Sequence, residues 1–267
     1  MMISQSFEER LLHHPHRLGF GKEQASPPLA LLDAGTCGMS SELGAVPKRS
    51  TRKQTSSAKN GAMSQHERSE PARYGGEIIA GALMIPESRI VAELLLRELA
   101  SGTWEDAIVT RNVLKTRSKA RAVRTSNLIR NRLESMQPAL WKMVRDEKGV
   151  IATHAVLAAA VKQSPLLGDF LALVVGEQYR RFAQSLSNKL WDDYLDGCRE
   201  RDPKMPHWSD ATRNRLRSSV FQTLAQAGYI ENTRSLRLQT VHVAGRVLDY
   251  LRTHNETYVL NCIQVAP

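Results

Sequence analysis

The sequence predicts a mainly α-helical protein with a disordered N-terminal tail. Three observations support this prediction. Apolar residues recur every three or four positions through most of the chain after residue 72, as in helices that bury one face. Two short stretches near the C-terminus, 236–243 and 258–265, alternate between apolar and polar residues as strands do. The first 72 residues follow neither pattern.

Size and charge limit the classes of function. The 267 residues are enough for two modest domains, each with its own core. The 37 lysines and arginines exceed the 27 acids, which gives a formal net charge of +10 and favours an anionic partner, either nucleic acid or an acidic protein surface. The 3 cysteines are scattered and form no Cys-x-x-Cys pair, so a reducing cytoplasm is the expected location.

Residues 1–72 are predicted to be a disordered tail. Gly, Pro, Ser and Thr are frequent there and 47–53 is a polar basic run, so the tail cannot bury enough apolar area to offset the entropy of ordering. Its first residues lack the basic end and apolar block of a signal peptide. Met63 opens a polar sequence directly before the periodic region, and we expect it to be the true start.

The region 73–147 is predicted to be a helical bundle domain. Its first part, 75–84, is apolar with small residues and suits a helix packed closely on a neighbour, after which Pro86 restarts the chain. A core helix is expected from Glu87 to Ala100 because its apolar residues have helical spacing. Thr103 is expected to cap the next helix.

A strongly basic helix is expected from a cap at Ser118 to about Met136. No acid occurs in 111–132, and the outward residues combine cations with amides, which suits contact with phosphates. The candidate nucleic-acid contacts here are Arg117, Lys119, Arg124, Asn127, Arg130 and Asn131. An ordinary solvated helix face is the alternative explanation.

The region 148–267 is predicted to be a second helical domain, separated from the first by a polar run. Its two apolar blocks, 150–161 and 166–175, are much shorter than the roughly 20 residues of a membrane-spanning helix, so we expect a buried helical hairpin. A helix over 188–200 follows, and its acids are Asp192, Asp193 and Asp196. No metal-binding motif accompanies these acids, so a solvated face is expected rather than a metal or nuclease site.

The stretch from Ser209 to Val243 predicts a helix followed by a short β-ribbon. Ser209 is expected to cap a helix over 211–227, which ends at Gly228 where a left-handed residue is needed. One side of the helix is apolar. The ribbon is expected from Tyr229 and Ile230, a polar turn, and the alternating stretch 236–243. A helix beside a basic ribbon is how a winged helix-turn-helix meets duplex DNA, although a solvated helix packed beside a hairpin explains the stretch equally well.

The other side of this helix and the ribbon supply the second group of candidate contacts. The group consists of Arg215, Ser218, Ser219, Gln222, Arg234 and Arg237. Gln226 lies on the same side of the helix. Arg213 and Arg217 fall near the apolar side and are expected to pair with carboxylates. After the ribbon, we expect a helix over 245–254 and a closing strand over 258–265.

Motifs of catalysis are absent from the sequence. It contains no Gly-rich phosphate loop, no Gly-x-Ser-x-Gly elbow and no His-Glu-x-x-His motif, so an enzyme is disfavoured. No cofactor and no metal are implied, and no membrane is expected as a partner.

Several runs of the sequence resemble the BrxA family of bacterial BREX phage-defence systems. The runs are Gly-Gly-Glu-Ile at 75–78, then 87–96, Trp104, 112–118 and 128–133. The resemblance covers about 74–265 and implies a mostly helical protein. Its first domain would be similar to the helical bundle of the antitermination factor NusB, and its second would contain a winged-helix-like module. The resemblance supplies no catalytic residues.

The expected function is therefore a non-catalytic accessory protein of phage defence that binds double-stranded DNA, mainly through phosphate contacts. The resemblance implies DNA binding within a system built around a methyltransferase and an ATPase, with other BREX subunits as candidate partners. A protein–protein adaptor within the defence complex and an RNA-binding protein are the alternatives.

Overall fold

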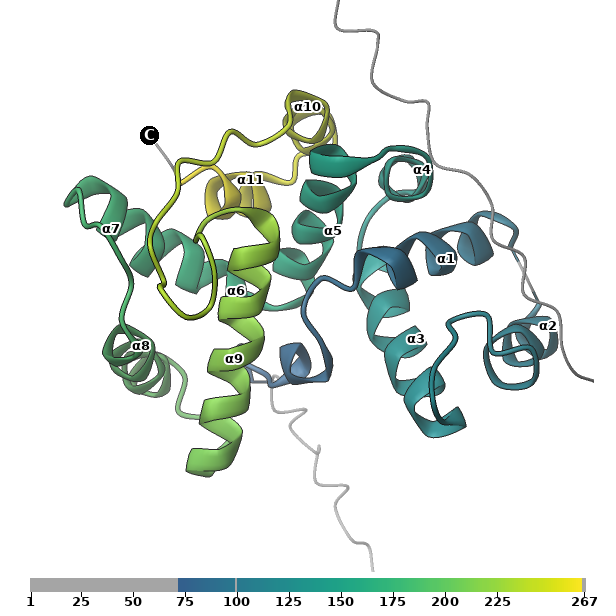
Figure 1. The fold of residues 1–267 in the computed structure, drawn as a ribbon, viewed down its shortest axis with the longest axis horizontal. Helices are drawn as coiled ribbons and strands as arrows, with labels where there is room; N and C mark the ends of the chain where they lie inside the picture. Colours follow the sequence, from purple (N-terminus) through teal and green to yellow (C-terminus); the bar gives the residue numbers. More distant parts are fainter. Residues whose placement is uncertain (1–71, 99, 266–267) are drawn as a thin grey trace, which may run out of the picture. The chain divides into compact units, whose positions relative to one another are not determined.

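The computed structural model describes residues 72–98 and 100–265 (Figure 1). Within these ranges the regular elements are helices, and β pairing is limited to two isolated bridges. This confirms the prediction of a mainly helical protein. Met63 and the predicted tail, apart from residue 72, lie outside the described residues.

The first elements in chain order are η1 (Glu77–Ala80), α1 (Ile85–Leu96), α2 (Ser101–Glu105), η2 (Asp106–Thr110), α3 (Lys119–Glu134) and α4 (Pro138–Asp146). The expected helix over 75–84 is only the 3-10 turn η1, because Gly81 is extended and Met84 has a left-handed backbone. Thr103 lies inside α2 and does not cap it, because the extended residue that precedes this helix is Ala100. The α1 helix also ends at Leu96, earlier than predicted.

The later elements are α5 (Gly149–Gln163), α6 (Pro165–Asp169), η3 (Phe170–Val175), α7 (Gly176–Arg180), α8 (Asn188–Arg201), α9 (Asp210–Ala227), α10 (Gly245–Thr253) and α11 (Thr257–Ile263). The strand predicted over 258–265 is wrong, because this segment forms α11. Its buried residues Val259, Cys262 and Ile263 have the spacing of a helix face.

The two apolar blocks form α5 and the run from α6 to α7, and both are largely buried, as predicted. They do not form a hairpin, because the chain bends by 109° at the break around Ser164 and makes a corner. Among the described residues no single helix is long and apolar enough to span a membrane, and this bent pair reaches that length and apolarity only when taken together.

Helix α5 lies at the centre of the described residues. It contacts α1, α3 and α4 as well as α9, α10 and α11, and the buried apolar residues of all these helices form one continuous cluster (Figure 1). Alanines 155, 158, 159 and 160 are fully or almost fully buried, which allows close approach of the neighbouring helices. The predicted boundary between two domains after residue 147 stays a prediction. Helix α5, which follows this boundary, packs against helices that precede it in the chain and against helices that come later.

Candidate nucleic-acid interface

Helix α9 forms as its sequence pattern predicts. The Ser209 hydroxyl accepts the backbone N–H of Thr212, and Gly228 ends the helix with a φ of 88°. The apolar side of α9, including Leu216 and Val220, is completely buried. Because the apolar side packs into the core, the opposite side of α9 faces solvent.

The segment after α9 forms a short hairpin, in which Ile230 pairs with Leu238 as the predicted ribbon requires. Glu231 donates its N–H to the carbonyl of Arg237 at 2.8 Å, and Gln239 donates to Tyr229 at 3.0 Å. The pairing stops there and 240–244 has no regular structure, so the ribbon predicted over 236–243 is wrong in its extent. The extended backbone also begins only after Leu236, because this residue has a φ of 52°.

A third segment pairs with this hairpin from before α8. Leu186 donates its N–H to the carbonyl of Leu236, and Leu238 donates to Gln184, both at 2.9 Å. The chain order around this small pairing is therefore an extended segment, α8, α9 and a hairpin.

The second group of candidate contacts is on the surface, with one exception. Arg215, Gln222, Arg234 and Arg237 are exposed, and no carboxylate of the described residues forms an ion pair with these arginines. Ser218 is also exposed, but its hydroxyl donates to the carbonyl of Asn214 at 2.8 Å. Ser219 is half-buried.

Two neighbouring arginines of α9 have structural roles. Arg213 forms an ion pair with Asp196 at 3.0 Å, and Arg217 approaches Asp192 at 3.6 Å. These contacts confirm the prediction that both arginines pair with carboxylates. Lys189 neutralises Asp193 at 2.7 Å, so each acid of the cluster on α8 has a cation beside it. The described residues contain no group of His, Cys, Asp and Glu arranged to hold a metal.

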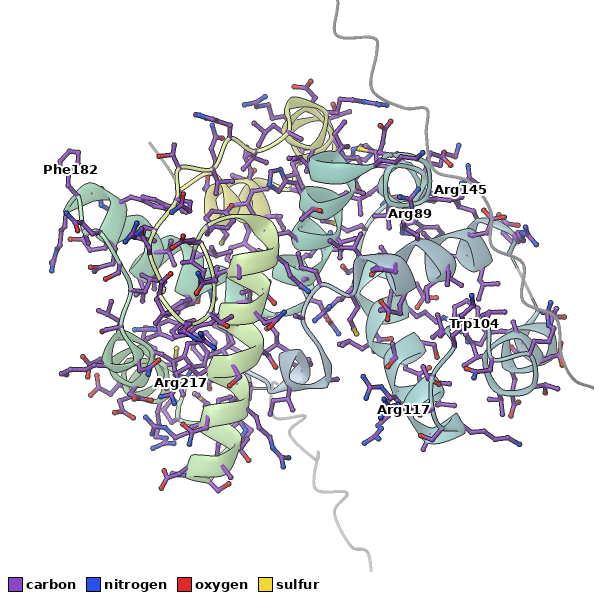
Figure 2. All side chains as sticks on the ribbon, in the orientation of Figure 1. Arg89, Trp104, Arg117, Arg145, Phe182 and Arg217 are labelled. Atoms are coloured by element: carbon purple, nitrogen blue, oxygen red, sulfur yellow. The ribbon has the colours of Figure 1, made fainter. Side chains whose placement is uncertain are left out.

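The first group of candidate contacts lies on α3 and just before it. Ser118 caps the helix by accepting the N–H of Arg121, as predicted. The candidates Arg117, Lys119, Arg124, Asn127 and Asn131 are all exposed, and the cations among them have no ion pair within the described residues. Figure 2 shows Arg117 at the end of α3 where the helix begins.

Arg130 differs from the rest of this group. Its guanidinium lies 4.7 Å from the centroid of the Trp104 ring and donates to Glu134 at 2.7 Å. Both the face and one edge of the guanidinium are therefore already in contact with the protein. Figure 2 shows Trp104 between α2 and α3.

The start of α3 is electrostatically unusual. A helix N-terminus carries a partial positive charge that acids normally offset, but the first turn of α3 contains Lys119 and Arg121 and no acid. Lys115 precedes them, and all three side chains lack an ion pair within the described residues. Lys115 and Arg121 are thus two cations that the candidate group omitted. Their position in the sequence, close to the Ser118 cap, is the feature that could have identified them as candidate contacts.

The segment 76–84 connects α3 with α9. The buried guanidinium of Arg132 on α3 donates to the carbonyls of Gly81 at 2.9 Å and Ala82 at 2.6 Å. On the other side, Leu83 donates its N–H to the side-chain oxygen of Gln226 on α9 at 2.9 Å. Element η1 contacts both helices, and Figure 1 shows both starting at the lower side of the view.

The start of the described chain is also fixed by buried acids. The Asp169 carboxylate accepts the hydroxyls of Tyr74 and Tyr258, each at 2.8 Å, and pairs with Arg73 at 2.9 Å. Asp202 accepts the backbone N–H of Tyr74 at 3.2 Å. Burial raises the pKa of the Tyr74 hydroxyl, which therefore stays a neutral donor. These contacts anchor the segment that leads to η1.

Comparisons with known proteins agree on one family. The model of the BrxA family matches residues 72–255. A relative from Paramagnetospirillum magneticum described as BREX protein BrxA is 50% identical over 194 residues, which are 73% of this chain and 98% of the relative. A second BREX protein BrxA, from Escherichia coli O9:H4, is 30% identical over 168 residues, which are 63% of this chain and 79% of the relative.

A solved structure shares the fold of this chain. The crystal structure of an uncharacterized protein from Magnetospirillum magneticum matches with a TM-score of 0.69 at 49% identity. The match covers 73% of this chain and 100% of that chain. The family match spans well over half of the present sequence, and the resemblance noted in its helical runs is thereby confirmed. The chain belongs to the BrxA family.

Proposed function

We propose that this protein is a non-catalytic accessory protein of a BREX phage-defence system and binds double-stranded DNA, mainly through phosphate contacts. The observation that carries the proposal is the free face of α9. It presents Arg215 and Gln222 to solvent beside a hairpin that bears Arg234 and Arg237. Family membership supports the link to BREX, since both curated relatives are named BREX proteins.

The order of elements around α9 supports a winged-helix-like module. In such modules a short strand precedes two helices, and a hairpin follows the second helix, which lies in the major groove of DNA. Here 184–186 pairs with 236–238, α8 and α9 lie between them in the chain, and the turn 232–235 would be the wing. Arg234 in this turn would contact a phosphate next to the groove.

Helix α3 would provide a second set of phosphate contacts. Its unpaired cations and its N-terminal dipole both favour a bound anion. The elements η1 to α4 would correspond to the bundle that is similar to NusB. The proposal further places the protein in the cytoplasm and assigns it no catalytic residue.

Fluorescence anisotropy across a salt series tests the proposal. The chain would be titrated onto a random duplex and onto each of its single strands. Tight binding to the duplex that weakens steeply with salt is expected, because phosphate contacts release counterions. In the double variant Arg215→Ala, Arg234→Ala the slope of log affinity against log salt should fall by about 2.

Arg252→Ala is the matched control. Arg252 is exposed as well, but it lies on α10 and already pairs with Asp249. A slope that falls equally in the control and in the double variant would remove Arg215 and Arg234 from the interface. Absence of duplex binding at low salt would favour the adaptor function, and preference for single strands would favour RNA binding.

A further inference from the structure

Helices α3 and α9 carry the same row of exposed side chains. Each helix begins at a serine that caps its first turn, Ser118 or Ser209. In both helices an alanine, an arginine and an amide stand two, six and thirteen residues after this cap. They are Ala120, Arg124 and Asn131 on α3, and Ala211, Arg215 and Gln222 on α9. All six residues are exposed, and their spacing places each set on one face of its helix.

The amides at the end of each row are free. Within the part of the chain that the structure describes, the side chains of Asn131 and Gln222 form no hydrogen bond. Gln226, one turn after Gln222, differs because its amide oxygen accepts the N–H of Leu83. Both rows therefore present an amide whose donor and acceptor are available to another molecule.

The arginines of the rows are also available. Arg215 has no ion pair among the described residues, and neither has Arg124. The Nε of Arg124 donates to the carbonyl of Ala120 at 3.4 Å, which leaves its two terminal nitrogens for a phosphate. Seven residues of helix separate arginine and amide in each row, which is about 10 Å or three base-pair steps.

The rest of both helices is poor in acids. Glu134 is the only acid of α3, and it accepts a hydrogen bond from Arg130. Asp210, the first residue of α9, is the only acid of that helix. Exposed helices commonly mix acids with bases, which support one another at a spacing of three or four residues. Two faces with cations and amides but few acids fit an anionic partner.

A free amide matches the edge of an adenine better than a phosphate. A phosphate only accepts hydrogen bonds, so it leaves the oxygen of an amide unpaired. In the major groove the N6 and N7 atoms of adenine offer one donor and one acceptor, and Asn or Gln pairs with both at once. The arginine two turns away can meanwhile hold the helix on the DNA backbone.

We propose that Asn131 and Gln222 each read an adenine in the major groove, so that DNA binding depends on base sequence. This inference rests on the proposed function and adds base selection to its phosphate contacts. The two rows are equivalent. Each places its amide on an A·T pair and its arginine on the neighbouring phosphates.

Selection from randomised duplexes tests the inference. The full chain selects from random 30-base-pair duplexes, and fluorescence anisotropy then compares an enriched duplex with a scrambled duplex of the same composition. The enriched duplexes should share A·T pairs at fixed positions and bind about twentyfold or more tighter than the scrambled ones. Gln222→Ala and Asn131→Ala should each reduce this ratio by about fivefold or more.

Asn261→Ala is the matched control. Asn261 is also an exposed amide on a helix, but it lies on α11 outside both rows. The ratio between enriched and scrambled duplexes should stay at the wild-type value in this variant. A ratio that also stays at the wild-type value in Gln222→Ala or Asn131→Ala would overturn the role of that amide.

Gln222→Lys separates base reading from phosphate contact. Lysine pairs with the N7 and O6 atoms of guanine, so the base selected at that position should change from A to G. A lysine that contacts a phosphate would instead strengthen binding to every duplex alike, and this result would overturn the inference.

The same experiment distinguishes this inference from the proposed function. Tight, salt-dependent binding to every duplex with no enriched sequence would overturn base reading and leave the proposed function in place. Absence of duplex binding at low salt would overturn both.

Discussion

The side-chain oxygen of Gln226 accepts the backbone N–H of Leu83 at 2.9 Å, although 143 residues separate them in the sequence. This bond joins α9 to the segment that Arg132 holds against α3. The two helices that carry the candidate contacts are thus connected through one short stretch of backbone. Substitutions that remove contacts to this stretch should lower the free energy of unfolding. Substitutions on the free helix faces should instead lower the affinity for DNA.

Gln226 and Gln222 provide the first test of this distinction. They lie one turn apart on α9, but only Gln226 has a partner among the described residues. Gln226→Ala should lower the free energy of unfolding by about 1 kcal/mol, because the N–H of Leu83 loses its acceptor. Its DNA affinity should not change. Gln222→Ala should lower the DNA affinity and leave the free energy of unfolding unchanged. Urea titration would measure the stability of both variants, and fluorescence anisotropy would measure their DNA affinity.

Arg132 is expected to be one of the most sensitive positions for stability. Its side chain is only 2% exposed and donates to two backbone carbonyls. Burial lowers its pKa to about 10, so it remains charged at neutral pH and its donors are all available. Arg132→Met should cost about 2–4 kcal/mol of unfolding free energy because the carbonyls of the half-buried residues Gly81 and Ala82 lose their donors.

Arg124→Met is the control for Arg132. It makes the same chemical change on the same helix at an exposed position, so chemical denaturation should show a change within about 0.5 kcal/mol. Equal destabilisation by Arg132→Met and Arg124→Met would contradict a specific role for the hydrogen bonds from Arg132 to the carbonyls of Gly81 and Ala82.

On α3, Arg130 should behave differently from the free cations. The double variant Lys119→Ala, Arg124→Ala should lower the salt slope of DNA binding by about 2 if both side chains contact phosphates. Arg130→Ala should leave the slope nearly unchanged, because its guanidinium already contacts Trp104 and Glu134. A slope that drops by about 1 in Arg130→Ala would show that DNA displaces these contacts.

His154 should make stability depend on pH. It is buried on α5, its Nδ1 accepts the N–H of Ala244 at 3.0 Å, and burial lowers its pKa. Above the ordinary pKa of 6.5 both the folded and unfolded states are neutral at this residue. As the pH falls below 6.5, the unfolded chain binds a proton first, so stability should decrease by at most about 1.4 kcal/mol per pH unit.

His154→Asn isolates this contribution. Asn keeps an acceptor for the N–H of Ala244 but does not titrate. The slope of unfolding free energy against pH below pH 6.5 should therefore decrease by up to the contribution of one bound proton, about 1.4 kcal/mol per pH unit. His207→Asn makes the same chemical change at an exposed position and is measured alongside as the control. An unchanged pH dependence in His154→Asn would contradict the assignment.

The sequence by itself determined the helices whose signals are local. Ser118, Ser209 and Gly228 mark helix ends through bonds that span only a few residues, and the apolar spacing of α3 and α9 identified their buried sides. The same spacing predicted that Arg213 and Arg217 pair with acids, since both fall near the boundary of the buried side. Local chemistry was sufficient at these positions.

Short alternating stretches could not be assigned from the sequence. Val259, Cys262 and Ile263 fit a helix face as well as part of a strand pattern, and only packing of α11 on α5 and α10 decided between them. The ribbon after α9 ended early because its pairing depends on the segment 184–186, which lies before α8. A strand exists only where a partner is available.

Only the tertiary structure decided which polar side chains remain free. Gln222 and Gln226 are the same residue type on the same side of α9, and Arg124 and Arg130 share one helix. Gln226 and Arg130 are engaged by Leu83 and by the Trp104 ring, which come from elsewhere in the chain, whereas Gln222 and Arg124 have no such distant partner and are exposed. The physical reason is that helical period fixes a side chain's direction, whereas its partners depend on how distant segments pack.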